Sequence, residues 1–157
     1  MSKSAYEDRD DLEKIQSQWT KLTGLHTRTE WSAAVVRAAT AAELAANFAI
    51  RKEFKARSKF DSDFVDGLLV WANGLSGKVD RLLLPLHEGK EHHATLKELK
   101  PVTEEINKKR NSIVHQGQFC SESEATRIIQ HARKFIETLT KLYKKDFILK
   151  DKKESED

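Results

Sequence analysis

Apolar residues recur every three or four positions along nearly the whole chain, which is the spacing of one face of an α-helix. The pattern predicts six helical segments that are separated by short polar or glycine-containing turns. They cover residues 4–23, 29–57, 61–73, 76–86, 94–116 and 121–143. No stretch alternates apolar and polar residues for long enough to indicate a strand, and there is no internal repeat. The sequence therefore predicts an all-α, up-and-down helical bundle of five to six helices.

The segment at residues 29–57 is the most apolar of the six. Between Ser32 and Ile50 nearly every position is apolar, and the few polar residues gather along one seam. A helix with so little polar surface is normally central and contacts other helices on several sides. Its many alanines let those neighbours approach closely. We therefore expect this helix to form the centre of the bundle.

The predicted helices belong to one domain, because 157 residues suffice to bury a core without disulfides or structural metals. Residues 1–27 are expected to form an N-terminal amphipathic helix within that domain. Residues 28–149 are expected to form the main bundle. Residues 150–157 are strongly charged and predict a flexible tail.

Composition limits the partners and the compartment. The formal net charge is +3, from 28 Lys and Arg against 25 Asp and Glu, which permits an anionic partner such as RNA without attracting one by charge alone. Cys120 is the only cysteine, so an intrachain disulfide is impossible and a reducing compartment is expected. The polar N-terminus does not resemble a secretory signal, and the apolar stretches at 38–46 and 82–86 are too short to span a membrane. We expect a soluble cytoplasmic protein.

The segment from Asn107 to Gly117 contains the main candidate chemistry. Arg110 is followed by four residues and then by His115, and the first of the four is the polar Asn111. This segment ends the penultimate predicted helix at Gly117, lies downstream of the alanine-rich helix, and precedes a capped amphipathic last helix. Over about residues 28–145 this arrangement resembles the HEPN family, whose members are small helical bundles with an Arg, four to six residues and a His.

The resemblance implies two kinds of function. Many HEPN domains are metal-independent endoribonucleases, often toxins or defence effectors, that act as homodimers with both Arg/His pairs at the interface. Others bind a nucleotide or a partner protein, such as a nucleotidyltransferase, without cleaving RNA. The first reading predicts an endoribonuclease with RNA as substrate, no cofactor and an antitoxin as a further partner. The second reading is the alternative, and a helical scaffold in which the motif is incidental is a third.

The residue types suit cleavage of RNA by attack of its 2′-hydroxyl. That reaction needs a base for the 2′ proton and an acid for the 5′ oxygen, and His115 can serve as either. Arg110 can hold the phosphate with two N–H donors, and Asn111 can assist. In an ideal helix, however, Arg110 and His115 point apart. Either a loosened last turn before Gly117 or a second copy of the helix is then needed to bring such groups together.

A plainer interpretation of the same residues remains. Without the resemblance, Arg110 is a surface residue that forms a salt bridge with Glu104 or Glu105, and His115 is an ordinary histidine at a helix end. Lys108 and Lys109 can contact phosphate, although charge on a helix surface is the commoner explanation. No metal site is expected.

Two other residues, Glu43 and Asn47, are candidates for supporting the Arg110–His115 site. Glu43 and Asn47 lie one turn apart on the apolar helix, where a carboxylate needs a partner. Glu43 is predicted to meet Arg110 and position it, or else to pair with Arg37, Arg51 or solvent. A group of histidines and glutamates could be mistaken for a metal site but is expected to form a surface loop. Its members are His87, Glu88, Glu91, His92 and His93.

Overall fold

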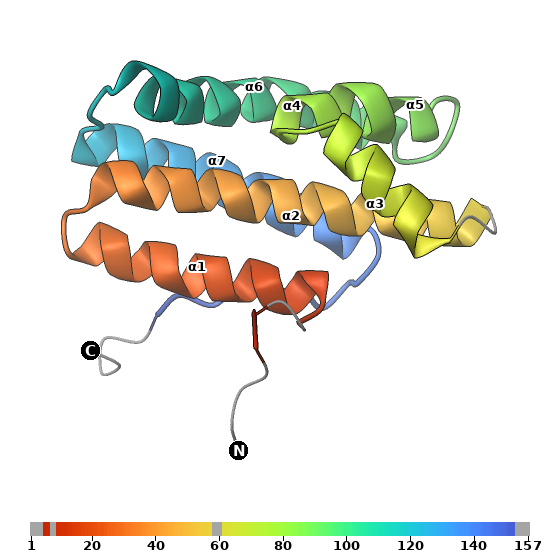
Figure 1. The fold of residues 1–157 in the computed structure, drawn as a ribbon, viewed down its shortest axis with the longest axis horizontal. Helices are drawn as coiled ribbons and strands as arrows, with labels where there is room; N and C mark the ends of the chain where they lie inside the picture. The colour runs from red at the N-terminus through yellow and green to blue at the C-terminus, as the bar shows by residue number, and fades with distance from the viewer. Residues whose placement is uncertain (1–4, 7–8, 58–60, 153–157) are drawn as a thin grey trace.

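The computed structural model describes residues 5–6, 9–57 and 61–152, and these residues form helices and connecting turns without any strand. Four long helices run side by side along the molecule, and a group of shorter helices covers one end (Figure 1). The helices are α1 (Asp11–Thr27), α2 (Trp31–Arg57), α3 (Ser62–Trp71), α4 (Leu75–Lys78), α5 (Leu84–Leu86), α6 (His93–Gln116) and α7 (Glu122–Lys141), and a π-helical segment, η2 (Val79–Leu83), joins α4 to α5. The predicted all-α bundle is confirmed.

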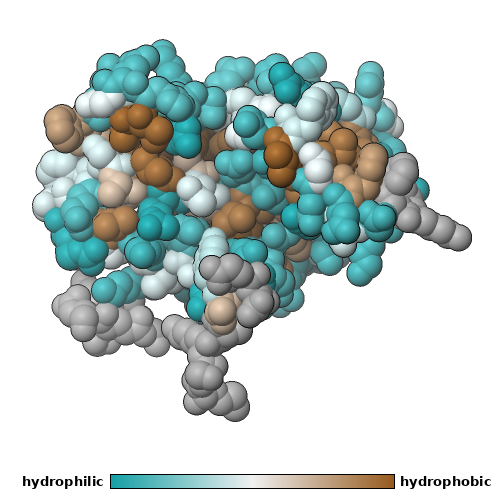
Figure 2. Space-filling model, in the orientation of Figure 1, coloured by the Kyte–Doolittle hydropathy of each residue, from teal (hydrophilic) through white to brown (hydrophobic). Residues whose placement is uncertain are grey.

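Helix α2 lies at the centre, as its apolar sequence predicts. It packs against α1, α7, α6 and the α3–α4 region, so its small side chains are buried on several sides. By length and composition alone α2 could also cross a membrane, but 61% of its most apolar window is buried inside the bundle. The surface in the view of Figure 2 is largely hydrophilic, with separate apolar spots. Helix α2 therefore forms part of the core of this bundle.

Side-chain caps set the first residues of the outer long helices. Asp10 accepts a hydrogen bond from the backbone N–H of Glu13, and Glu13 reaches back to the N–H of Asp10, so α1 begins at Asp11 and not at residue 4. Ser121 and Glu124 make the same reciprocal pair at the start of α7, as the sequence predicts. Part of the predicted first helix, residues 1–4 and 7–8, lies outside the described residues.

The C-terminal segment packs against α1. The backbone N–H of Lys150 donates to Gln16 Oε1 (3.0 Å), and Trp19 Nε1 donates to Asp151 Oδ1 (2.8 Å). The side chain of Lys152 lies across Gly24, where a Cβ atom would be 3.3 Å from Lys152 Cδ. Helix α1 ends at Thr27, past the predicted end at residue 23. Residues 150–152, which the sequence predicts to be part of a flexible tail, are instead hydrogen-bonded to α1. The remainder of that tail, residues 153–157, lies outside the described residues.

Candidate functional site

The last turn of α6 is wider than an ordinary helical turn. The backbone N–H of Gly117 donates to the carbonyl of Ser112, five residues earlier, and the N–H of Gln118 donates to the same carbonyl (3.1 Å). Gly117 closes the turn with a positive φ of 65°, a conformation that costs glycine little. The sequence predicts such loosening before Gly117, two residues after His115.

Arg110 and His115 approach each other within a single chain. Arg110 Nη1 lies 3.4 Å from His115 Nε2, and the same nitrogen donates to Asn111 Oδ1 at 3.3 Å. The convergence that an ideal helix would not give is therefore present without a second copy of the chain. All three predicted residues lie together at the C-terminal end of α6.

No carboxylate of the described residues pairs with Arg110. Glu105, its alternative partner by sequence, binds Arg127 Nη2 through both carboxylate oxygens (2.9 Å each) and lies 2.9 Å from His131 Nε2. A guanidinium has five N–H donors. Among the described residues only Nη1 of Arg110 makes a polar contact, so the other donors remain for an anionic ligand.

The Arg110–His115 pair opens into a polar cleft between three parts of the chain. Its volume of 530 Å³ is within the range of sites for small ligands. One wall is α6, the second is α2, and the third is the turn that leads into α4. The lining residues are Ala39, Thr40, Glu43, Asn73, Gly74, Leu75, Ser76, Gly77, Asn107, Arg110, Asn111 and His115. The cleft can hold a nucleotide-sized molecule next to an arginine and a histidine.

Glu43 lines this cleft, but the prediction that it pairs with Arg110 is wrong. Glu43 Oε1 accepts from Lys78 Nζ (2.7 Å) and from the backbone N–H of Gly74 (3.2 Å), and not from Arg110. Arg37 and Arg51, the alternative partners, bind other side chains. Lys78 is 35 positions away in sequence and becomes a neighbour only because α4 folds onto α2. Glu43 therefore anchors the turn that forms one wall.

Asn47 is separate from the cleft. Its Oδ1 atom is buried without a hydrogen-bond partner among the described residues, one turn beyond Glu43 on α2. It does not line the cleft that contains Arg110 and His115. The structure therefore does not bring this predicted supporting residue to the site.

The two predicted phosphate-binding lysines differ in their surroundings. Lys109 forms an ion pair with Glu124 at the start of α7. Lys108 is exposed and has no ion pair with a described residue. Both line a second cleft, of 630 Å³, between α6 and α7, and Asn111 borders both clefts. Only Lys108 keeps its charge available for a phosphate next to the site.

Several polar residues of the cleft have no predicted role. Asn107 lies one turn before Asn111 on α6, so helical spacing alone could have identified it. Asn73, Ser76 and Thr40 come from a turn and from α2. No sequence signal links those three to Arg110, because their proximity depends on how the helices pack.

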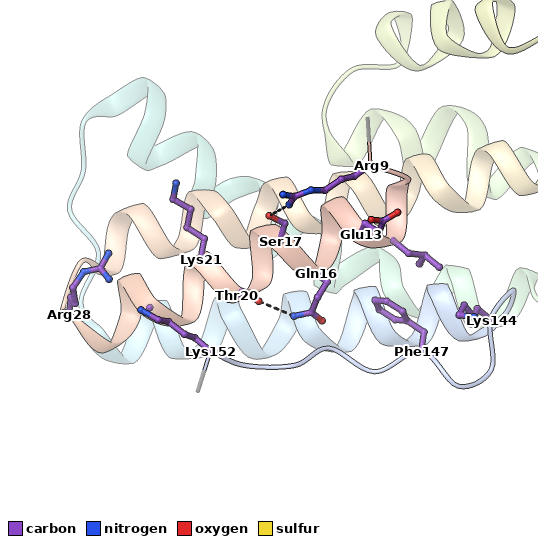
Figure 3. Close-up of a pocket in the computed structure, with 12 residues that line it drawn as sticks. Arg9, Glu13, Gln16, Ser17, Thr20, Lys21, Arg28, Lys144, Phe147 and Lys152 are labelled. Atoms are coloured by element: carbon purple, nitrogen blue, oxygen red, sulfur yellow. Dashed lines mark hydrogen bonds between the residues drawn. The ribbon is translucent and has the colours of Figure 1, made fainter. Parts of the chain in front are cut away.

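A larger cleft lies on another side of the bundle, between α1 and the C-terminal segment (Figure 3). Its volume is 830 Å³, and cations line it, together with Gln16, Glu13 and Phe147. Most of these cations have partners within the chain: Arg9 donates to Ser17 (3.0 Å), Arg28 pairs with Glu30 (3.1 Å) and Lys144 with Asp146 (3.8 Å). No histidine lines this cleft. It therefore lacks the acid–base group that the Arg110–His115 cleft has.

A second histidine cluster lies in the interior. His87, expected on a surface loop, is only 2% exposed. Its Nε2 atom lies 3.1 Å from the Tyr143 hydroxyl and 3.2 Å from Glu53 Oε1, and Arg57 pairs with Glu53 at 2.7 Å. We call His87, Glu53, Arg57 and Tyr143 the His87 cluster. Among the described residues, no group of three or more His, Cys, Asp or Glu side chains is placed to hold a metal ion.

Comparison with known proteins gives no match to this chain, whether to family models, to curated protein sequences or to solved structures. The resemblance to HEPN domains therefore stays a prediction from the sequence of this chain.

Proposed function

We propose that the protein is a metal-independent endoribonuclease of HEPN type, a toxin or defence effector of the cytoplasm. The observation that supports this most is the approach of Arg110 Nη1 to His115 Nε2 at 3.4 Å, at the edge of a cleft open to solvent. A cation without a carboxylate partner beside an imidazole is suited to a phosphodiester. Asn111 orients the guanidinium through its own side-chain oxygen.

The proposed reaction is an internal transesterification. The 2′-oxygen of RNA attacks the adjacent phosphorus, the bond from phosphorus to the 5′-oxygen breaks, and the products carry a 2′,3′-cyclic phosphate and a 5′-hydroxyl. One histidine accepts the proton of the 2′-hydroxyl, and a protonated histidine donates a proton to the leaving 5′-oxygen. Arg110 stabilises the negative charge that gathers on the non-bridging oxygens.

A second copy of the chain would supply the second histidine, since His115 is the one histidine that lines the cleft. Two exposed apolar side chains flank His115: Val114 is 45% exposed, and Phe119, just after Gly117, is 92% exposed. In a symmetric dimer the same patch meets itself, which would bring the two sites together. Phe119→Asp should then convert a dimer to a monomer in size-exclusion chromatography with light scattering. A parent protein that is monomeric at micromolar concentration would contradict the dimer.

The activity is tested by incubating the purified protein with a mixed RNA pool in EDTA. The parent should cut RNA, and His115→Ala and Arg110→Ala should not. His131→Ala and Arg127→Ala are matched controls, because both side chains lie next to Glu105 on the α6–α7 surface and neither lines the Arg110–His115 cleft, and they should cut as the parent does. Circular dichroism confirms that each variant is folded. If the folded parent leaves all RNA intact but a nucleotide raises its melting temperature, a binding module replaces the nuclease.

A further inference from the structure

The wall of the cleft opposite α6 presents a carboxylate in a fixed position. Both hydrogen bonds to Glu43, from Lys78 Nζ and from the N–H of Gly74, reach the same oxygen, Oε1. Lys78 is itself buried, with its side chain 4% exposed, so this anchor does not move freely. The Glu43 side chain is 37% exposed, and no described residue donates a hydrogen bond to its Oε2 atom. One carboxylate oxygen is therefore held by the protein while the other is available to a ligand.

An ionised carboxylate accepts hydrogen bonds and donates none, which makes it selective among the four RNA bases. Guanine alone has two adjacent N–H donors, N1–H and the N2 amino group, on the edge that a single-stranded base exposes. In adenine and cytosine the amino group is next to a ring nitrogen that accepts hydrogen bonds and repels a carboxylate. In uracil the single N–H lies between two carbonyls. The Oε2 atom has two lone pairs and can accept from both of these neighbouring donors, so Glu43 favours guanine over the other three bases.

The remainder of the cleft suits the same base. Asn73 and Asn107 bring side-chain amides to the cleft, and an amide N–H can donate to the guanine O6 acceptor. Arg110 and His115 line the cleft as well, so a base near Glu43 has its phosphate group within the same 530 Å³. We infer that the cleft binds a guanosine nucleotide of RNA, with Glu43 as the residue that selects the base. This inference rests on the proposed function, since it identifies the nucleotide next to the cut.

The inference can be tested by binding alone, without cleavage. Guanosine, inosine, adenosine, cytidine and uridine 3′-monophosphates are titrated into the full-length protein by isothermal calorimetry. Inosine differs from guanosine only by loss of the N2 amino group. We expect guanosine monophosphate to bind about tenfold more tightly than the inosine and adenosine compounds, because they lack that donor to Glu43. Equal affinity for guanosine and inosine overturns the inference.

Two variants then assign the selectivity to a residue. Glu43→Gln keeps an oxygen that can accept from Lys78 and Gly74 but loses the charge, so the preference for guanosine over inosine should disappear. Glu105→Gln removes a carboxylate that lies outside the cleft and should keep the preference. If Glu43→Gln retains the parent's preference, the assignment to Glu43 is wrong. If that variant does not fold, the inosine comparison on the parent protein still decides whether the N2 amino group is recognised.

Failure here is distinct from failure of the nuclease proposal. Selective binding of guanosine monophosphate by a protein that cuts no RNA would support the base site and contradict the nuclease. Cleavage next to all four nucleotides at equal rates, with no binding preference, would support the nuclease and overturn the base site.

Discussion

The His87 cluster and the Arg110–His115 pair each combine an arginine with a histidine, and they differ in almost every physical respect. In the His87 cluster the imidazole is buried and touches both Tyr143 and Glu53, and the arginine is paired with Glu53. In the Arg110–His115 pair the imidazole is exposed, and the arginine has no carboxylate partner among the described residues. The arginine and the histidine thus have partners within the chain in the His87 cluster, whereas in the Arg110–His115 pair they are accessible to a ligand.

The electrostatics of the His87 cluster explain why it is structural. Burial lowers the pKa of His87 from its ordinary value, and the opposing attraction of Glu53 does not restore it, so folding disfavours the protonated imidazole. Burial alone would raise the pKa of Glu53, but the hydrogen bond from Tyr143 and the nearby Arg57 outweigh it and lower that pKa. These contacts tie Glu53 of α2 to His87 and to Tyr143, and they leave the histidine and the arginine of the cluster paired within the chain. An accessible side chain without a partner is therefore a better indicator of a functional site than a buried side chain that is already paired.

The largest expected effect is a difference in RNA cleavage between variants of the two arginines, Arg110 and Arg57. Arg110→Ala should lower kcat for RNA cleavage by about 10²–10³-fold, the usual loss when one charge-stabilising donor group is removed from a transition state. Arg57→Ala should leave kcat unchanged while it lowers stability, because Arg57 binds only Glu53. Single-turnover cleavage measures both variants. An equal loss of kcat in the two would remove the distinction between the clusters.

The two histidines should differ in their contribution to the free energy of unfolding, and the larger contribution should come from His87. His87→Ala leaves a cavity and removes a partner of buried Glu53, so the free energy of unfolding should fall by about 2–4 kcal/mol. His115→Ala changes an exposed side chain and should alter that free energy by less than about 0.5 kcal/mol. Urea denaturation followed by circular dichroism measures the two values. A larger loss for His115→Ala than for His87→Ala would contradict the assignment.

A milder substitution tests the hydrogen bonds of the His87 cluster. Tyr143→Phe keeps the ring that packs edge-on against Phe48 but removes the hydroxyl that donates to Glu53 Oε1 at 2.6 Å. The free energy of unfolding should fall by about 1–2 kcal/mol, while RNA cleavage at saturating substrate stays at the parent's rate. Reduced cleavage in a stably folded Tyr143→Phe protein would indicate that the His87 cluster acts on the site.

The smallest predicted effect is a pH dependence of stability. The folded pKa of His87 is lower than its value of 6.5 when unfolded, so below pH 6.5 the unfolded chain binds a proton that the folded protein does not. Stability is therefore full above pH 6.5 and declines as the pH falls, by at most about 1.4 kcal/mol per pH unit for one proton. His87→Gln should flatten this decline between pH 6.5 and 5. Identical slopes in the parent and in His87→Gln would exclude His87 as the cause.

Local chemistry explains which features could be predicted from the sequence. The helices follow from the spacing of apolar residues, and the approach of Arg110 to His115 agrees with the expected loosening of the turn at Gly117. The pairing of Glu43 with Lys78 could not be predicted, because it joins residues 35 positions apart through the packing of α4 on α2. The burial of His87 could not be predicted for a similar reason, since its partners Glu53 and Tyr143 come from α2 and from the turn after α7.

The central claim is cleavage of RNA through its own 2′-hydroxyl at the Arg110–His115 cleft. The most direct measurement compares two oligonucleotides in EDTA: an RNA that the protein cuts, and the same RNA with a single 2′-deoxy nucleotide immediately 5′ of the cut. The account predicts that the first gives a 2′,3′-cyclic phosphate and a 5′-hydroxyl end, and that the second stays intact at that position. Cleavage of both oligonucleotides at the same position, or no cleavage of any RNA by the folded protein, would contradict it.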